Sequence, residues 1–150
     1  MKAITVCQPY AELLARGPDV KPFENRTWST KYRGPLAIHA GKSLDYWDAA
    51  DERVYGIKRE EMVLGAFIAV CDLVACLPKL YPADPYNWPE PWLALADHET
   101  AEGPYCFAVV NMRRLKTPIP WRGALGLWTV PDDVLVQIQA QRREVTVPTP

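Results

Sequence analysis

Residues 21–42 read KPFENRTWSTKYRGPLAIHAGK, a stretch that mixes lysine and arginine with one acid, the large aromatic side chains of Trp28 and Tyr32, and a histidine. A strand that only fills a hydrophobic core has no need of such a mixture. Cations bind phosphates and carboxylates, and aromatic rings stack on flat groups. The composition of this stretch therefore indicates a polar cleft that binds an anionic ligand with a flat ring.

The first half of this stretch alternates in the manner of a β-strand. Because successive side chains of a strand point to opposite faces, Glu24, Arg26 and Trp28 are expected on one face. Lys21 precedes the strand, so the pattern does not assign the direction of its side chain. Two interpretations of Arg26 stay open. It binds a ligand anion, or it pairs with Glu24 and holds that acid in place.

Basic residues are concentrated in two separate parts of a chain whose net charge is only −1. Residues 1–42 carry seven basic and three acidic side chains, and residues 113–122 carry four basic and no acidic ones. Either the two blocks meet in the fold and form one basic patch, or the charges alternate over a solvated surface. The sequence alone leaves both arrangements open.

Alternating and β-branched segments predict strands at 2–6, 23–28, 35–40, 63–77, 105–112 and 124–130. Capping residues and prolines predict helices at 10–16, from Ser43 or Asp45 to about 51, and at 131–143, before a loose tail at 144–150. Residues 113–123 are expected to form a basic turn. Five or six strands with few short helices favour an α+β fold, a mixed β-barrel in one domain over residues 1–150.

Residues 77–93 carry five prolines interleaved with four aromatic residues, Tyr81, Tyr86, Trp88 and Trp92. This composition is typical of a rigid surface excursion with polyproline character. The aromatic side chains are expected to pin the loop to the barrel. The loop is also a candidate docking surface for a protein partner.

No apolar run is long enough to span a membrane, and the N-terminal segment lacks the hydrophobic region of a signal peptide, so a cytoplasmic location is expected. The four cysteines show no metal-binding spacing and lie in apolar, strand-like segments. This context favours buried free thiols. No metal site and no cofactor are predicted.

A series of short motifs follows one another along the chain: Gln8-Pro9-Tyr10-Ala11, Gly17, Lys21, Glu24-x-Arg26-x-Trp28, Tyr32-Arg33-Gly34 and Ile38-His39-Ala40. Gly103-Pro104-Tyr105 and the segment PIPWRGALGLW at 118–128 complete the series. This order resembles the ASCH domain (activating signal cointegrator homology), a branch of the PUA-like β-barrels. The resemblance covers about residues 4–130, and the spaced Lys, Glu and Arg with Trp and YRG are its specific part.

The resemblance implies a PUA-like barrel with a basic cleft beside the first helix, in a family linked to RNA binding and RNA metabolism. Small members of the family act as amidohydrolases on N4-acetylcytidine and use a lysine, a threonine and a glutamate. Lys21 falls on the position of that lysine. Glu24 stands where those members have the threonine, so the chain departs from their catalytic pattern.

The predicted cleft holds a nucleotide or a single-stranded RNA segment. Its expected ligand-binding residues are Gln8, Tyr10, Lys21, Glu24, Arg26, Trp28, Arg33, His39, Lys42 and Arg122. Arg33, Lys42 and Arg122 are assigned to phosphates together with Arg113 and Arg114, and Trp121 is a further candidate for stacking. The alternative is a hydrolase of a modified nucleoside or RNA in which Lys21 and Glu24 are the catalytic pair.

Overall fold

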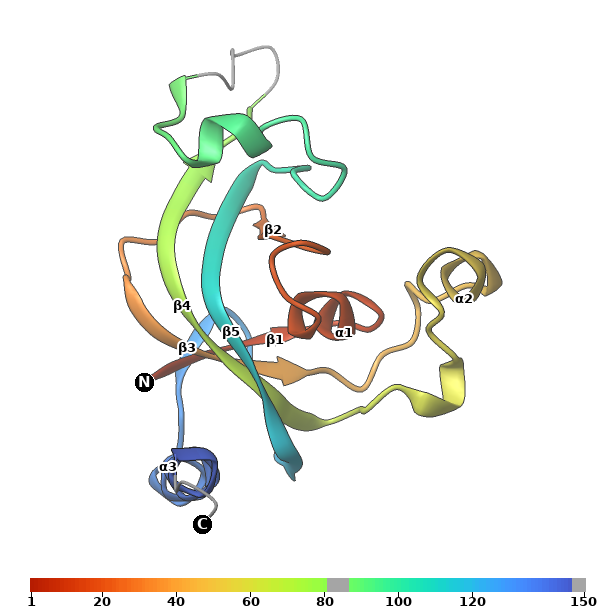
Figure 1. Ribbon diagram of the computed structural model, residues 1–150, viewed down its shortest axis with the longest axis vertical. Helices are drawn as coiled ribbons and strands as arrows, with labels where there is room; N and C mark the ends of the chain where they lie inside the picture. The colour runs from red at the N-terminus through yellow and green to blue at the C-terminus, as the bar shows by residue number, and fades with distance from the viewer. Residues whose placement is uncertain (81–86, 147–150) are drawn as a thin grey trace.

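A computed structural model describes residues 1–80 and 87–146 of the protein (Figure 1). Within these residues, six strands form one mixed sheet in the order β2-β5-β4-β3-β1-β6. The strands are β1 (Lys2–Val6), β2 (Phe23–Arg26), β3 (Gly34–Ala40), β4 (Ala66–Pro78), β5 (Tyr105–Pro120) and β6 (Leu127–Thr129). β1 pairs with β3 in parallel and with β6 in antiparallel orientation. The sheet curls into a half-barrel, as expected for a small α+β barrel.

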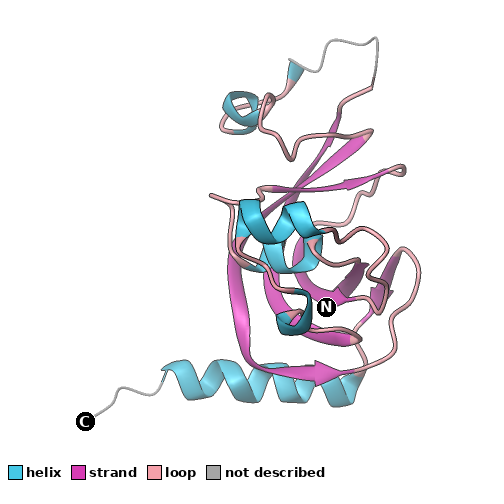
Figure 2. Ribbon diagram, turned by 90° about the vertical axis from the view of Figure 1, so that its right-hand side faces the viewer, coloured by secondary structure: helices cyan, strands magenta, loops and turns pink. Residues whose placement is uncertain are grey.

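Short helices lie around this sheet. They are α1 (Tyr10–Ala15), α2 (Ala49–Tyr55) and α3 (Asp132–Thr146), with 3-10 turns η1 (Arg59–Glu61) and η3 (Trp92–Leu95). Figure 2 shows α3 crossing one end of the half-barrel, where Val134 and Ile138 pack against Phe67 of β4. No helix in the described part of the chain is long and apolar enough to cross a lipid bilayer.

The strand predictions at 2–6 and 35–40 are confirmed, and the long central strand predicted at 63–77 is β4. β2 ends at Arg26, two residues before the predicted end. The predicted basic turn at 113–123 is wrong, because β5 continues to Pro120. There it pairs with the start of β4 across an irregular register, and Leu115 and Ile119 are buried against α3. Tertiary packing therefore overrides the turn signal of Pro118 and Pro120.

The helix predicted to begin at Ser43 or Asp45 begins instead at Ala49. The Ser43 hydroxyl accepts a hydrogen bond from the Asp45 backbone N–H, so it closes a local turn and does not cap the helix. At the other end of the chain, α3 extends to Thr146, past its predicted end at 143. Residues 147–150 of the predicted tail lie outside the described residues.

The described aromatic residues of the proline-rich segment pack against the sheet, as predicted. Trp88 is buried, contacts the edge of Phe23 at 5.6 Å between ring centroids, and donates its indole N–H to the Pro78 carbonyl. Trp92 packs against the same cluster. Tyr81 and Tyr86 lie outside the described residues. All four cysteines are free, with Cys71 and Cys106 buried.

The segment that precedes β5 is fixed to β2 by one side chain. The Asn25 amide donates to the Thr100 carbonyl and accepts from the backbone N–H groups of Glu102 and Gly103. Gly103 has a φ of +74°, and a Cβ placed there would lie 2.8 Å from the Lys79 carbonyl oxygen. Only glycine fits this left-handed position so close to another backbone.

We therefore expect Gly103→Ala to destabilise the protein more than Gly126→Ala. Gly126 has a similar φ of +66°, but a Cβ there would meet no atom within 4 Å. Gly126→Ala is the control, and it should lower the free energy of unfolding by about 1–2 kcal/mol from backbone strain alone. Overpacking against Lys79 should add at least about 1 kcal/mol at Gly103. Urea denaturation measures both variants, and equal losses would show that the close approach does not matter.

Candidate functional site

A cavity of about 360 Å³ lies where the end of β1, α1 and β2 meet. Four of the predicted ligand-binding residues line it: Tyr10, Glu24, Arg26 and Trp28. Thr5, Cys7 and Tyr46 line it as well, and the sequence did not mark them as site residues. We call this space the Trp28 cavity.

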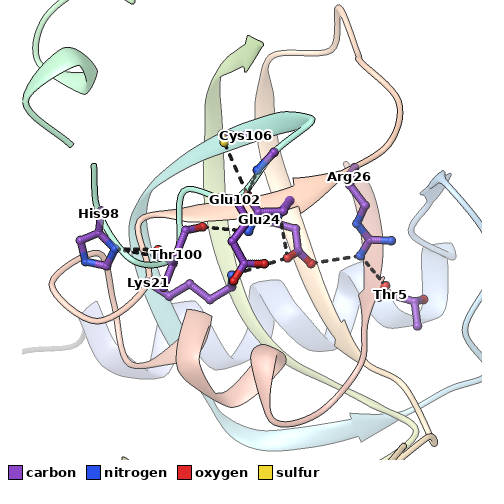
Figure 3. A network of polar contacts seen from close by, with 10 residues as sticks. Thr5, Lys21, Glu24, Arg26, His98, Thr100, Glu102 and Cys106 are labelled. Carbon is purple, nitrogen blue, oxygen red and sulfur yellow. Dashed lines mark hydrogen bonds and ion pairs between the residues drawn. The ribbon is translucent and has the colours of Figure 1, made fainter. Parts of the chain in front are cut away.

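The carboxylate of Glu24 lies between two cations at the wall of this cavity (Figure 3). One carboxylate oxygen is 3.9 Å from the Lys21 ammonium, and the other is 3.1 Å from the Arg26 guanidinium. The side chains of Lys21 and Glu24 are only 4% and 9% exposed. This acid is therefore held in a fixed position, largely away from water, with both of its oxygens facing positive charge.

Local structure explains how the three side chains meet. Glu24 and Arg26 are two residues apart on β2, so they share a face as predicted. Lys21 reaches the same face because the chain turns after α1, where the Lys21 backbone N–H bonds the Gly17 carbonyl. The Arg26 guanidinium also donates to the Thr5 carbonyl at 2.8 Å, which ties β2 to β1.

Lys21 is a buried cation of the site. Burial lowers the pKa of its ammonium from the usual 10.5, and the nearby carboxylates of Glu24 and Glu102 oppose this shift only in part. The Tyr10 ring covers the ammonium, with the Lys21 nitrogen 5.5 Å from the ring centroid. The sequence did not predict that Glu102 acts on Lys21, because the two residues are far apart along the chain. Asn25 anchors the segment that carries Glu102 and so brings its carboxylate near Lys21.

Aromatic rings form two sides of the Trp28 cavity. Trp28 is half-buried and meets the edge of Phe107 at 5.2 Å between ring centroids, so it lines the cavity and also packs on the core. Tyr10 is 40% exposed, and its ring centroid lies 6.1 Å from that of Tyr46.

The Arg26 Nε atom is buried and has no hydrogen-bond partner among the described residues.

Two predicted ligand-binding residues, Gln8 and Arg33, form hydrogen bonds with backbone groups and do not line the Trp28 cavity. The amide of Gln8 is buried, donates to the Val63 carbonyl and accepts from the Glu12 backbone N–H at the start of α1. Arg33 is exposed and donates to the Thr30 and Tyr32 carbonyls of its own loop.

A second cavity, of about 890 Å³, brings together parts of the two basic blocks. Lys42 and Arg122 line it together with His39 and Trp121. We call it the Arg122 cavity. Arg113 and Arg114 lie elsewhere, beside a third cavity of about 500 Å³ between β5 and α3. Arg114 donates two hydrogen bonds to the Glu12 carboxylate. The basic blocks therefore meet at Lys42 and Arg122, but not along their whole length.

His39 is a buried side chain at the edge of the Arg122 cavity. Its Nε2 lies 2.7 Å from the Trp121 carbonyl oxygen, and because a carbonyl only accepts, Nε2 carries the proton. Burial lowers the pKa of the imidazole, which therefore stays neutral at pH 7. Its ring packs edge-on against Phe67 and Trp128, so His39 supports the cavity wall.

Within residues 1–80 and 87–146, no group of three or more His, Cys, Asp or Glu side chains is arranged to hold a metal ion. Comparisons with known proteins found that no family model matches the chain and that no curated protein matches it significantly.

The buried position of Glu24 predicts a large cost for removing its charge. Glu24→Gln removes the acid that pairs with both Lys21 and Arg26, and breaking such a buried pair should cost about 3 kcal/mol. Glu12→Gln is the matched control, because Glu12 also joins two cations, Arg16 and Arg114, but at the surface. We expect the control to cost less than about 1 kcal/mol in urea denaturation. Similar costs would mean that the Glu24 cluster is solvated.

Proposed function

We propose that the protein is a single-stranded RNA-binding protein of the ASCH type, with a PUA-like barrel, and that it holds one unpaired base in the Trp28 cavity. The observation that carries this proposal is the Glu24 carboxylate, fixed between Lys21 and Arg26 at the wall of a cavity that Tyr10 and Trp28 also line. The sequence resemblance to ASCH domains agrees with the proposal, and the free cysteines agree with a reducing, cytoplasmic setting.

The size of the cavity favours a small, flat group. Its volume of about 360 Å³ lies near the lower end of the range for small-ligand sites, which is roughly 300–1,000 Å³. A duplex cannot enter such a space, whereas an unpaired base can turn into it. The ligand is therefore a free nucleoside or a base of a single strand.

The chemistry of the walls suits a base with an exocyclic amine. A carboxylate accepts hydrogen bonds from such an amine, and the position of Glu24 is fixed by its two cations. The buried Nε–H of Arg26 is a donor that has no hydrogen-bond partner among the described residues. Tyr10 and Trp28 supply ring faces and edges for packing against the base.

A titration of purified protein with a labelled single-stranded RNA at two salt concentrations tests the proposal. We expect binding that weakens with salt. Tyr10→Ala should weaken it about 5- to 150-fold, because stacking on one base is worth about 1–3 kcal/mol. Val136→Ala removes an exposed apolar side chain from α3 and should have no effect. Absence of RNA binding, or equal binding by Tyr10→Ala, would contradict the proposal.

A second candidate function is hydrolysis of a modified nucleoside in the same cavity, and the burial of Lys21 favours it. A lysine whose pKa is lowered can lose its proton and act as a base. Lys21 lies behind Glu24 and is not among the described residues that line the cavity. With N4-acetylcytidine, it would take a proton from an attacking water that reaches it beside Glu24 and pass that proton to N4 as the amide bond breaks, which releases cytidine and acetate. Glu24 stands where the amidohydrolase members of the ASCH family have threonine, so its carboxylate would have to replace that hydroxyl.

Chromatographic detection of cytidine released from N4-acetylcytidine tests this candidate. Lys21→Met should abolish turnover while nucleoside binding survives. The wild-type rate should rise with pH as the Lys21 ammonium loses its proton, at a pH below the usual lysine value of 10.5. Turnover by Lys21→Met, or no turnover by the wild type, would exclude Lys21 as the catalytic base. RNA binding would then remain as the proposed function.

A further inference from the structure

We propose that the Arg122 cavity is a second subsite, which takes the phosphate and the neighbouring nucleotide of a strand whose unpaired base lies in the Trp28 cavity. The ligand is then a single strand of at least two nucleotides, and a free nucleoside fills only half of the site. This inference rests on the function proposed above, because it assigns the base to the Trp28 cavity.

The two cavities meet at one residue, Thr5, which lines both of them. On the side of the Trp28 cavity, the Thr5 carbonyl accepts a hydrogen bond from Arg26 at 2.8 Å. On the other side, the Thr5 hydroxyl accepts one from the Ala124 backbone N–H at 3.3 Å. In this proposal, the ligand crosses from one space to the other over Thr5 at the end of β1.

The charges of the two cavities differ in the way that a base and a phosphate require. In the Trp28 cavity, the Glu24 carboxylate pairs with both Lys21 and Arg26 and offsets part of their charge. The described residues that line the Arg122 cavity include two cations, Lys42 and Arg122, and no acid. Both cations are exposed, so neither is already committed to the core. An uncompensated lysine and arginine at the mouth of a cavity attract a phosphodiester.

The loop that carries Arg122 is held close to β1 and β3. A Cβ at Gly123 would lie 2.8 Å from the Thr5 hydroxyl and 3.0 Å from His39, so glycine is required for this approach. The Trp121 backbone is fixed at both of its polar groups, since its N–H bonds the Gly65 carbonyl and its carbonyl accepts from His39. The cationic wall is therefore preorganised, which lowers the cost of binding.

Trp121 supplies a surface for the second base. Trp121 is 38% exposed although its backbone is anchored, and it lines the Arg122 cavity. An exposed indole on a fixed backbone is the kind of platform on which bases of a single strand stack, whatever their identity. The volume of about 890 Å³ is larger than that of the Trp28 cavity and leaves room for a phosphate and a base together.

A ligand series tests the inference: each of the four nucleosides, its 5′-monophosphate and the dinucleotide of the same base joined by one phosphodiester, titrated by calorimetry. The dinucleotide should bind at least about 10-fold more tightly than the nucleoside. Lys42→Ala and Arg122→Ala should each remove most of this gain and leave nucleoside binding unchanged. Trp121→Ala should bring dinucleotide affinity down to that of the monophosphate.

The controls are Lys58→Ala and Arg59→Ala, which remove the same two kinds of charge from exposed positions that line neither cavity. With a longer labelled RNA, each cavity variant should flatten the slope of log affinity against log salt by about 0.7, the value for one phosphate contact on a single strand. The controls should leave that slope unchanged.

The outcomes separate this inference from the proposed function. If Tyr10→Ala weakens binding but the dinucleotide binds no more tightly than the nucleoside, the second subsite is excluded and the base cavity stands. The same conclusion follows if Lys42→Ala and Arg122→Ala have no more effect than the controls. If strand binding is insensitive to Tyr10→Ala, both proposals are overturned.

Discussion

The site depends on one buried acid, Glu24, that faces two cations. Taking a carboxylate and an ammonium out of water is expensive, and the arrangement is stable only while both partners stay in place. Much of the surrounding structure keeps them there: β2 holds Glu24 and Arg26 on one face, and the turn after α1 brings Lys21 back to them. The hydrogen bond from Arg26 to Thr5 then connects the acid to β1.

The same residue, Thr5, separates two environments of different charge. On one side Glu24 offsets part of the charge of Lys21 and Arg26, whereas on the other side no acid among the described lining residues offsets Lys42 and Arg122. The near-zero net charge of the chain conceals this local difference. A neutral base and a charged phosphate have opposite requirements for desolvation, so two adjoining cavities of this kind suit a nucleotide strand better than either one alone.

Local patterns in the sequence predicted what lies within one strand, and failed where distant segments meet. The period of two placed Glu24 and Arg26 on a shared face, which the structure confirms. Periodicity could not assign the direction of the Lys21 side chain, because Lys21 precedes the strand. It also could not show that Glu102 lies near Lys21. Gln8 was assigned to the ligand because of its motif, but its amide is used by the backbone at the start of α1. The resemblance to ASCH domains stays a prediction.

The most direct test of the account is an NMR titration of the tryptophan indole N–H signals with a short single-stranded RNA. We expect the Trp28 signal to move with RNA concentration, because its ring lines the cavity. Trp88 provides an internal reference, since its indole N–H is bonded to the Pro78 carbonyl in a separate cluster and should not respond. A titration in which the Trp28 signal stays fixed while RNA binds would contradict the placement of the base beside Glu24.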